Sequence, residues 1–413
     1  MSTAGLHSNS ISGYVFKIAT RCNLNCTYCY MYNLADSGWR RQPKRMALST
    51  VQKTAERMRE HCVRHGRKKV QITLHGGEPF LVGVDQMRDI VRTLRRTLEP
   101  AGIRCRITVQ SNGLLFSSQF GDMLTEEGVT LGISVDGPPN INDLHRVDHR
   151  GRGSSARLEK KLELLSRDYR SMFAGLLCVV NVDACPEATF DYLASFDPPT
   201  INFLLPVDNH DRLPPGMTPD GGATLYGDWL CTAFERWAKS PKKVRVLFFN
   251  SIINLLLGGS ALTESHGTEG ANLVVIEANG DIEAVDSLKG AYEGAATLGL
   301  NVFDHDFDAA ARRILQIEHE LGARSVADKC AICPMLDVCG GGDMPTRYAK
   351  TNGFRDPSIY CRDLQKIIAR IDSRIAEYRQ RPARFGGVAG CSPPGKVALA
   401  GGLTGTGAAA TAG

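Results

Sequence analysis

The sequence predicts an α/β protein built from parallel βα units. Its 413 residues are 43% hydrophobic and 23% charged, a composition that can bury a large core. Over the first 235 residues or so, short apolar runs typical of strands alternate with longer stretches of helical periodicity. This alternation favours parallel strands joined by helices, arranged as a barrel or as an open sheet. In both arrangements ligands bind at the C-terminal ends of the strands.

Six strands are expected in this first part, and a helix is expected between the first two. The helix begins near Ser49, which we expect as its N-cap, with Gln52 as the capping-box partner. The residues expected on the buried face of this helix are Val51, Ala55, Met58 and Cys62. The six strands are expected at residues 13–19, 70–74, 106–110, 130–135, 175–182 and 201–205.

The later part of the chain has weaker patterns. Residues from about Thr218 to Leu257 have helical periodicity. The turn at Asn279-Gly280 separates two strand-like runs, 273–277 and 281–285, and predicts a hairpin. A further helix is expected from about Arg362 to Arg379.

Four segments are therefore expected along the chain. They are a flexible N-terminus over 1–12, a barrel over 13–235, linker helices with a second cysteine-containing domain over 236–380, and a disordered tail over 381–413. The tail is rich in Gly, Ala, Thr and Pro and has almost no large apolar residues, a composition typical of disorder.

Charge and cysteine content restrict the class of protein. The net charge of +5 is weak, so we expect no nucleic-acid partner. The polar N-terminus lacks the apolar segment of a secretory signal, and no run approaches 18 apolar residues, so we expect no membrane partner. These features predict a cytoplasmic protein. In a reducing cytosol the 13 cysteines are expected to be metal ligands, catalytic thiols or core residues.

Three cysteines follow the first expected strand within eight residues: Cys22, Cys26 and Cys29. A zinc site would need a fourth ligand, whereas an iron–sulfur cube held by three cysteines leaves one iron open. The C-x3-C-x2-C spacing, with Tyr28 before the third cysteine, resembles the signature of the radical S-adenosylmethionine (SAM) enzymes. The resemblance implies a partial (β/α)6 radical SAM barrel, a 4Fe–4S cluster on these cysteines, and SAM bound at the open iron.

A second element of the resemblance ends the second expected strand. The residues Gly76-Gly77-Glu78-Pro79 resemble the GGEP element of that family. Glycines there permit close backbone approach, and the resemblance implies that the Glu78 carboxylate receives the amino group of SAM. The alternative is a plain Gly-Gly turn with a solvated Glu78.

Three further positions are expected to contact SAM. In the peptide-modifying branch of the family a Ser and an Arg hold the SAM carboxylate, and Ser134 and Arg146 match that pattern. A guanidinium can bind a carboxylate with two hydrogen bonds, which suits this role. The alternative for Ser134 is turn chemistry before Gly137. Leu205, at the end of the sixth strand, is expected to pack against adenine.

A second cysteine group comprises Cys330, Cys333, Cys339 and Cys361. Its spacing alone suits a tetrahedral zinc site and a fully ligated 4Fe–4S cluster equally well. The group resembles the SPASM domain of peptide-maturing radical SAM enzymes, which carries seven cysteines and two auxiliary clusters. Two positions depart from that pattern, because Asp343 and Val285 stand where a full SPASM domain has cysteines. The resemblance therefore implies a reduced SPASM-type domain with one closed auxiliary cluster, and two 4Fe–4S clusters in total.

Asp286 is the residue predicted to act as the general base. In the sulfatase-maturase relatives of this family, the Asp at this position faces the substrate. The alternative is an Asp at the end of a hairpin that is hydrogen-bonded to backbone.

The expected function is that of a radical SAM peptide-modifying oxidoreductase. Segments over 273–289 and 339–361 resemble the FxsB-type, cyclophane-forming maturases of ribosomally synthesised peptides. This implies a crosslink between an aromatic ring carbon and the β-carbon of a nearby residue, after hydrogen abstraction by a 5′-deoxyadenosyl radical. The expected partners are a precursor peptide and a flavodoxin- or ferredoxin-type reductant.

Three alternatives to crosslinking are kept. The first is an anaerobic sulfatase-maturase that forms formylglycine. The second is another peptide oxidation, such as thioether formation. The third is a cluster- or zinc-binding interaction module without catalysis.

Overall fold

The computed structural model describes residues 10–219, 222–263, 265–268, 272–320 and 326–380. Most of the expected flexible N-terminus and the whole expected tail over 381–413 lie outside the described residues. Residues up to Arg374 belong to one compact unit, and the second unit begins at Ile375. The expected boundary near residue 235 stays a prediction.

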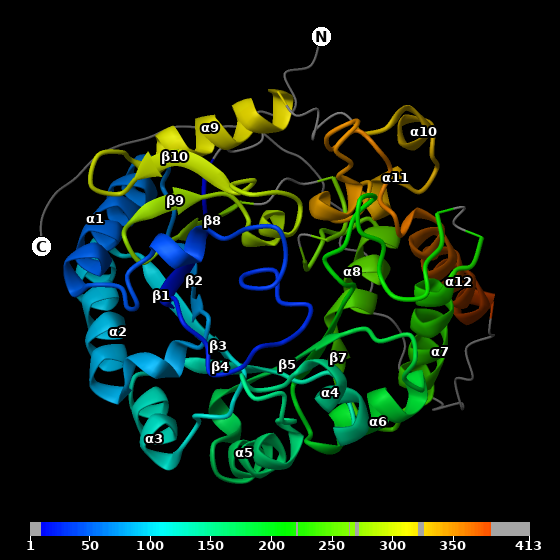
Figure 1. The fold of residues 1–413 in the computed structure, drawn as a ribbon, viewed down its shortest axis with the longest axis horizontal. Helices are drawn as coiled ribbons and strands as arrows, with labels where there is room; N and C mark the ends of the chain where they lie inside the picture. Colours follow the sequence, from blue (N-terminus) through cyan, green and yellow to red (C-terminus); the bar gives the residue numbers. More distant parts are fainter. Residues whose placement is uncertain (1–9, 220–221, 264, 269–271, 321–325, 381–413) are drawn as a thin grey trace, which may run out of the picture. The chain divides into compact units, whose positions relative to one another are not determined.

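One mixed sheet runs through the first unit. In the described residues it has ten strands in the order β10-β9-β8-β1-β2-β3-β4-β5-β6-β7. The first six strands are parallel neighbours in chain order, as predicted. Their bounds are β1 Gly13–Ala19, β2 Lys69–Gly76, β3 Arg104–Ser111, β4 Thr130–Ser134, β5 Phe173–Val179 and β6 Thr200–Leu204. Helices cover the outer side of these curved strands (Figure 1), so the predicted α/β partial barrel is confirmed.

The later strands extend the same sheet at both edges. They are β7 Arg245–Val246, β8 Leu273–Ile276, β9 Asp281–Glu283 and β10 Thr297–Asn301. The predicted hairpin is present as the antiparallel pair β8 and β9. Its first strand pairs in parallel with β1, so that Gly13 lies opposite Leu273. As a result the hairpin lies beside β1, the strand that leads into the first cysteine loop.

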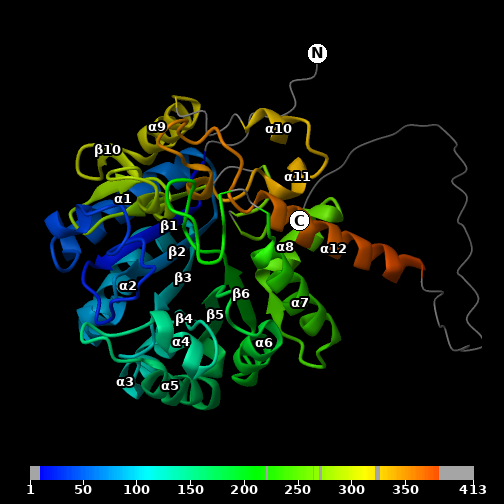
Figure 2. The ribbon, with the colours of Figure 1, turned by 45° about the vertical axis from the view of Figure 1, so that its right-hand side comes forward.

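The outer layer consists of helices that connect or follow the strands (Figures 1 and 2). In the barrel part they are α1 Leu48–Arg64, α2 Val84–Leu98, α3 Ser118–Glu126, α4 Pro139–His145, α5 Ser155–Asp168, α6 Pro186–Ser195 and α7 Leu225–Lys239. In the later part they are α8 Leu247–Leu256, α9 Phe307–Glu320, α10 Asp328–Ala331, α11 Leu336–Cys339 and α12 Cys361–Gln380. Short 3-10 helices include η2 Pro79–Val82, η5 Asp286–Gly290 and η6 Met344–Arg347.

Two helix predictions need correction. The first helix begins at Leu48 with Ala47 as its N-cap, so Ser49 lies inside the helix. No side chain caps this helix, and the Met46 amide just before it donates to the carbonyl of Ile18 at 3.0 Å. The four residues predicted for its buried face are all buried. The helical stretch to Leu257 is broken after Lys239, because Pro241 forces Ser240 into an extended conformation.

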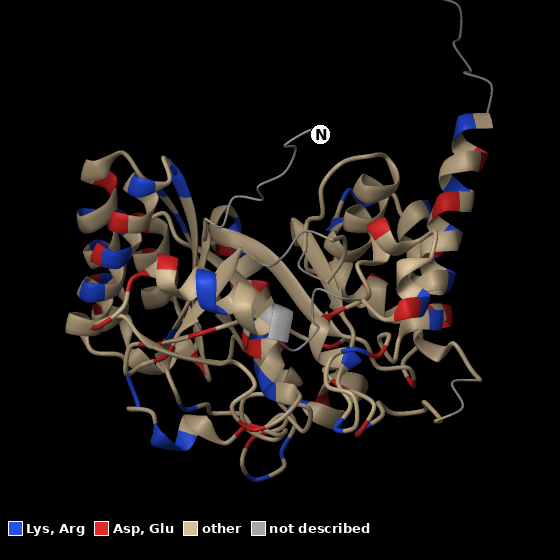
Figure 3. Ribbon diagram, turned by 90° about the horizontal axis from the view of Figure 1, so that it is seen from above, with Lys and Arg blue, Asp and Glu red and all other residues tan. Residues whose placement is uncertain are grey.

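Charges are mixed over the outer helices. Figure 3 shows Lys and Arg interspersed with Asp and Glu along the helices, which agrees with the weak net charge. Among the described residues, none of the helices has the length and apolar character needed to cross a membrane.

Candidate active site at the carboxyl edge of the sheet

The first cysteine loop begins directly after β1 and carries three free thiols. The pKa of Cys22 is raised to about 12 and that of Cys29 to about 11, mainly by burial and in smaller part by the charges of neighbouring thiols. The Leu24 amide donates a hydrogen bond to Cys22 Sγ at 3.4 Å. Three half-buried thiolates on one loop are costly unless a cationic centre binds them. The donor set therefore fits an iron–sulfur cluster held by Cys22, Cys26 and Cys29.

The Gly76-Gly77 turn packs tightly against this loop. The Gly77 amide donates to the carbonyl of Ala19 at 2.7 Å, and the Glu78 amide donates to the carbonyl of Arg21 at 3.0 Å. A Cβ on Gly77 would lie 2.3 Å from the Arg21 oxygen, and one on Gly76 would lie 2.0 Å from the Ala19 oxygen. Both positions therefore require glycine because the backbone of the cysteine loop occupies the space.

Glu78 is fully buried, so the alternative of a solvated side chain is wrong. Its Oε1 accepts hydrogen bonds from the Phe80 amide at 3.0 Å and Ser111 Oγ at 2.8 Å. Its Oε2 accepts one from the Asn112 amide at 2.9 Å. Burial raises the pKa of Glu78 to about 7, and these hydrogen bonds limit the rise. The carboxylate thus ties the ends of β2 and β3 together, with acceptor capacity left for one more donor.

Arg146 lies buried beside the cysteine loop. Its Nη1 donates to Tyr28 Oη at 2.9 Å, and Tyr28 Oη in turn donates to Asp136. Arg146 is 7% exposed, and its Nε has no hydrogen-bond partner in the described part of the chain. A buried guanidinium with an unused donor fits the carboxylate of SAM.

Ser134 and Leu205 lie at the same edge of the sheet. Ser134 ends β4, and its hydroxyl accepts a hydrogen bond from Gln110 Nε2 at 3.0 Å. Leu205 directly follows β6 and is half-buried. The predicted SAM contacts therefore come from the ends of β2, β4 and β6 and from the segment after α4.

Asp286 is the first residue of η5, and side chains surround its carboxylate. It forms an ion pair with Lys17 and accepts a hydrogen bond from Tyr30 Oη at 3.1 Å. Burial alone would raise the pKa of Asp286, but the positive charge of Lys17 holds it well below its usual range. Asp286 is therefore an ionised carboxylate beside the cysteine loop. Its partners are the side chains of Lys17 and Tyr30, whereas the alternative expected hydrogen bonds to backbone.

Sequence reasoning missed Lys17 and Tyr30, and it favoured a structural role for His75, which borders the GGEP element. Lys17 Nζ lies 2.9 Å from His75 Nδ1 as well as against Asp286. Lys17 interrupts the apolar run of β1, and a charged residue inside a buried strand is the signal that could have identified it. Tyr30 and His75 were adjacent to the motifs, following Cys29 and preceding Gly76.

The second cysteine group is also assembled by the fold. The four thiols are free, and they lie in or beside α10, α11 and α12. The pKa of Cys339 is raised to about 11, mainly by burial and in smaller part by the charges of Cys361, Cys330 and Cys333. Burial also raises the pKa of Cys330, and the charge of the buried Arg347 opposes that rise. Asp343 and Val285, the two positions at which the sequence departs from the SPASM pattern, directly precede η6 and η5.

His61, His65 and Asp308 lie together away from the cysteine loop, and these residue types can bind a metal. Their hydrogen bonds indicate a structural role instead. His61 Nδ1 and His65 Nε2 each lie 2.7 Å from Asp308 Oδ1. The Ile11 amide donates to His61 Nε2 at 3.0 Å, so the proton of the neutral ring is on Nδ1. A metal on Nδ1 would require loss of that proton. We therefore interpret the group as a polar network that joins α1 to α9.

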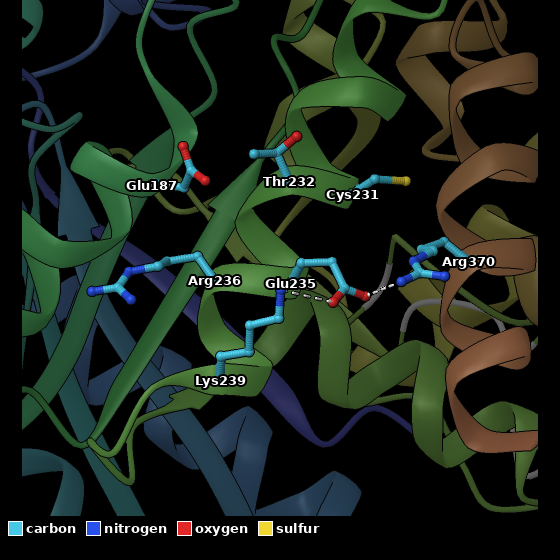
Figure 4. Close-up of a pocket in the computed structure, with 7 residues that line it drawn as sticks. All are labelled: Glu187, Cys231, Thr232, Glu235, Arg236, Lys239 and Arg370. Carbon is cyan, nitrogen blue, oxygen red and sulfur yellow. Dashed lines mark ion pairs between the residues drawn. The ribbon is translucent and has the colours of Figure 1, made fainter. Parts of the chain in front are cut away.

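A cavity of about 370 Å³ lies among outer helices and is separate from the candidate site (Figure 4). Glu235 of α7 forms ion pairs there with Arg370 of α12 at 2.7 Å and with Lys239 at 3.8 Å. Burial raises the pKa of Cys231 in this cavity to about 11, so its thiol stays neutral. The charges in the cavity are largely paired, and none of its residues belongs to the site described above.

Comparison with known proteins identifies the barrel. Residues 16–190 match the family model of the radical SAM superfamily, so this part of the chain is similar to radical SAM domains. A Cysteine-type anaerobic sulfatase-maturating enzyme of Clostridium novyi (strain NT) is 22% identical over 89% of this chain and 96% of the relative. A Serine-type anaerobic sulfatase-maturating enzyme of Klebsiella aerogenes is 24% identical over 79% of this chain and 77% of the relative.

Solved structures show the same fold. Native anSMEcpe with bound AdoMet and Cp18Cys peptide superposes with a TM-score of 0.74 at 20% identity, covering 89% of this chain and 98% of that chain. Streptococcus suis SuiB bound to precursor peptide SuiA gives 0.54 at 15% identity, covering 86% of this chain and 76% of that chain. The chain thus has the radical SAM α/β fold.

The comparisons also overturn the expected function. Several relatives that match most of the chain are named anaerobic sulfatase-maturating enzymes, whereas the sequence patterns favoured a cyclophane-forming maturase. The prediction of aromatic crosslinking is therefore wrong. It gave too much importance to short resemblances around Asp286 and Cys339, and to the missing SPASM cysteines, compared with similarity along the whole chain.

Proposed function

We propose that this radical SAM protein oxidises a Cys or Ser side chain of a peptide substrate to formylglycine. The observation that carries the proposal is Asp286, an ionised carboxylate placed beside the first cysteine loop through Tyr30. The similarity to anaerobic sulfatase-maturating enzymes over most of the chain supports it. Peptide-bound neighbours with the same fold support a peptide as substrate.

The radical SAM family implies a 4Fe–4S cluster and SAM. We propose Cys22, Cys26 and Cys29 as the cluster ligands. Bound together, the cluster and SAM supply a 5′-deoxyadenosyl radical that removes a hydrogen atom from the substrate.

The side chains proposed to position SAM are those at the ends of the strands. Arg146 and Ser134 would bind the carboxylate, with the unused Arg146 Nε as one donor. Glu78 would accept from the amino group, and Leu205 would pack against adenine. Gly76 and Gly77 would hold the turn close to the cysteine loop, and Tyr28 would orient Arg146.

Asp286 is proposed to accept the proton of the reaction. Oxidation of a Ser or Cys β-carbon to the aldehyde level removes one hydrogen atom, one proton and one electron. For Ser the product is the aldehyde itself, and for Cys water then replaces sulfur, which leaves as hydrogen sulfide. An ionised carboxylate within reach of the substrate thiol or hydroxyl is suited to take the proton.

A second cluster is proposed on Cys330, Cys333, Cys339 and Cys361. With four protein ligands this site would be closed to substrate, and the cluster would supply an electron acceptor. A zinc ion on the same four thiols is the competing assignment. Anaerobic metal analysis separates them, because two cubes require about eight irons per chain and one cube with zinc requires about four. We also propose that a flavodoxin- or ferredoxin-type protein supplies electrons to the enzyme. The proposed location is the cytoplasm.

The function is tested with synthetic peptides. The anaerobically reconstituted enzyme is incubated with SAM, a chemical reductant and three peptides that differ only in carrying Cys, Ser or Ala at one position. We expect a hydrazide-reactive aldehyde from the Cys or Ser peptide and none from the Ala peptide. A product that lacks an aldehyde, or an internal crosslink detected by tandem mass spectrometry, would contradict the proposal.

A further inference from the structure

A lysine is completely buried in the first strand of the barrel. The Lys17 side chain has no exposed area, and its neighbours Phe16 and Ile18 are buried apolar residues. A buried ammonium is strongly unfavourable unless charged or polar partners surround it. The identity of those partners therefore indicates why the chain places a lysine there.

The sheet register brings one partner to Lys17. Strands β1 and β2 are parallel, and Lys17 lies directly opposite His75 in their pairing. The two side chains consequently share one face of the sheet, and Nζ of Lys17 lies 2.9 Å from Nδ1 of His75. The second partner, Asp286, comes from η5, which follows the hairpin that pairs with β1.

The contact with Lys17 determines the tautomer of His75. An ammonium has only donors, so Nδ1 of His75 must accept, and the ring proton is on Nε2. The pKa of His75 is lowered to about 3, mainly by burial and in smaller part by the charge of Lys17. His75 is therefore a neutral imidazole whose Nε2–H remains a donor.

The same ammonium determines the charge of Asp286. The groups that face this carboxylate are Lys17 from β1, His75 from β2, Tyr30 from the cysteine loop and Lys289 from η5. Burial alone would raise the pKa of Asp286, and Lys17 makes the largest opposing contribution. Without Lys17, burial would dominate and the carboxylate would become protonated closer to neutral pH.

We propose that Lys17 is a positioning residue that keeps Asp286 ionised and His75 in its Nε2–H form, so that the site pairs one proton acceptor with one neutral donor. The inference rests on the proposed function, in which Asp286 receives the substrate proton. A peptide residue matches this pair, because its thiol or hydroxyl can give a proton to Asp286 and its backbone carbonyl can accept a hydrogen bond from His75. The rate of peptide oxidation is then independent of Asp286 titration across the neutral range.

The test compares Lys17→Met with Lys239→Met, which removes a largely exposed lysine that pairs with Glu235 at 3.8 Å. Peptide oxidation and 5′-deoxyadenosine are measured from about pH 5.5 to 8.5. Lys17→Met should lose product as the pH falls, recover part of it as the pH rises, and release more 5′-deoxyadenosine per product at low pH. Lys239→Met should follow the wild-type profile. An equal loss by Lys17→Met at every pH would overturn the proposal.

A second measurement does not depend on peptide oxidation. In wild type the depressed pKa of Asp286 stabilises the fold at all pH values above the unfolded pKa. In Lys17→Met the pKa would be raised, so the folded state would bind the proton more tightly and lose stability as the pH rises. The gap in thermal midpoint between wild type and Lys17→Met holoenzyme should therefore widen from about pH 5 to 7, and Asp286→Asn added to Lys17→Met should narrow it.

The two measurements keep the two proposals separable. A constant gap in thermal midpoint across the pH range would overturn the role of Lys17 whether or not the peptide reacts. A widening gap, together with wild-type enzyme that oxidises neither the Cys nor the Ser peptide, would sink the proposed function and leave the role of Lys17 in place.

Discussion

The turn at Gly77 offers a sharp test of how the first cysteine loop is held. Gly77 has an ordinary backbone conformation, so alanine would cause no dihedral strain there. The added Cβ would, however, lie 2.3 Å from the carbonyl oxygen of Arg21 and 2.1 Å from Tyr32 Oη. The tyrosine can move, whereas the Arg21 carbonyl is part of the loop that leads into Cys22.

The cost of Gly77→Ala follows from those contacts. Overpacking of a buried position costs about 1–3 kcal/mol. The strands must also separate, which weakens the hydrogen bonds from Gly77 to Ala19 and from Glu78 to Arg21, at about 1 kcal/mol each. We therefore expect Gly77→Ala to destabilise the protein by roughly 3–5 kcal/mol, which is a large share of the usual stability of a domain.

The assay is chemical unfolding of the anaerobic holoenzyme together with its iron content. Gly259→Ala is the matched control, because Gly259 also has an ordinary conformation and its added Cβ would lie 3.2 Å from the nearest atom. We expect the control to cost about 1 kcal/mol or less and to keep its iron, whereas Gly77→Ala loses iron from the SAM site. Equal stabilities and equal iron contents for the two variants would refute the reasoning.

Four further predictions address the rest of the molecule. Arg146→Met should weaken SAM binding to the anaerobic holoenzyme by roughly 10- to 100-fold in equilibrium dialysis, because a charged hydrogen bond is worth about 1.5–3 kcal/mol; unchanged affinity would remove Arg146 from the SAM site. Asp286→Asn should slow single-turnover peptide oxidation by roughly 10²- to 10⁴-fold, the range for loss of a general base, and a rate equal to wild type would exclude Asp286 as that base. Cys339→Ser should reduce the iron content from about eight to about four per chain, whereas an unchanged iron content with loss of zinc would favour the zinc assignment. His61 has a pKa lowered to about 4 by burial, so stability should fall by up to about 3 kcal/mol as the pH drops from about 6.5 to 4, and His61→Gln should flatten this dependence in calorimetry.

Much of the barrel could be predicted because its signals are local. Apolar runs located all six parallel strands to within a few residues, and the first was predicted with its observed bounds, Gly13–Ala19. The Asn279-Gly280 turn likewise located the hairpin. Cysteine spacing and the Gly76-Gly77 pair marked the edge where the site lies, because parallel strands bring their C-terminal ends together.

The rest depends on contacts between distant parts of the chain. Nothing local indicates that Leu273 pairs with Gly13, yet this pairing brings Asp286 to the barrel. The role of Lys17 likewise depends on His75 and Asp286, which lie 58 and 269 residues further along. The hydrogen bonds that bury the Glu78 carboxylate could not be read from its motif either, because its partners Ser111 and Asn112 belong to the next strand end.

The measurement that tests the central claim most directly is hydrogen transfer from the substrate. A peptide is synthesised with deuterium on the β-carbon of its Cys or Ser residue and incubated with the anaerobic enzyme, SAM and reductant. The account predicts deuterium in the 5′-deoxyadenosine that is formed and an aldehyde at the labelled residue. Unlabelled 5′-deoxyadenosine, or transfer of deuterium without an aldehyde in the peptide, would contradict it.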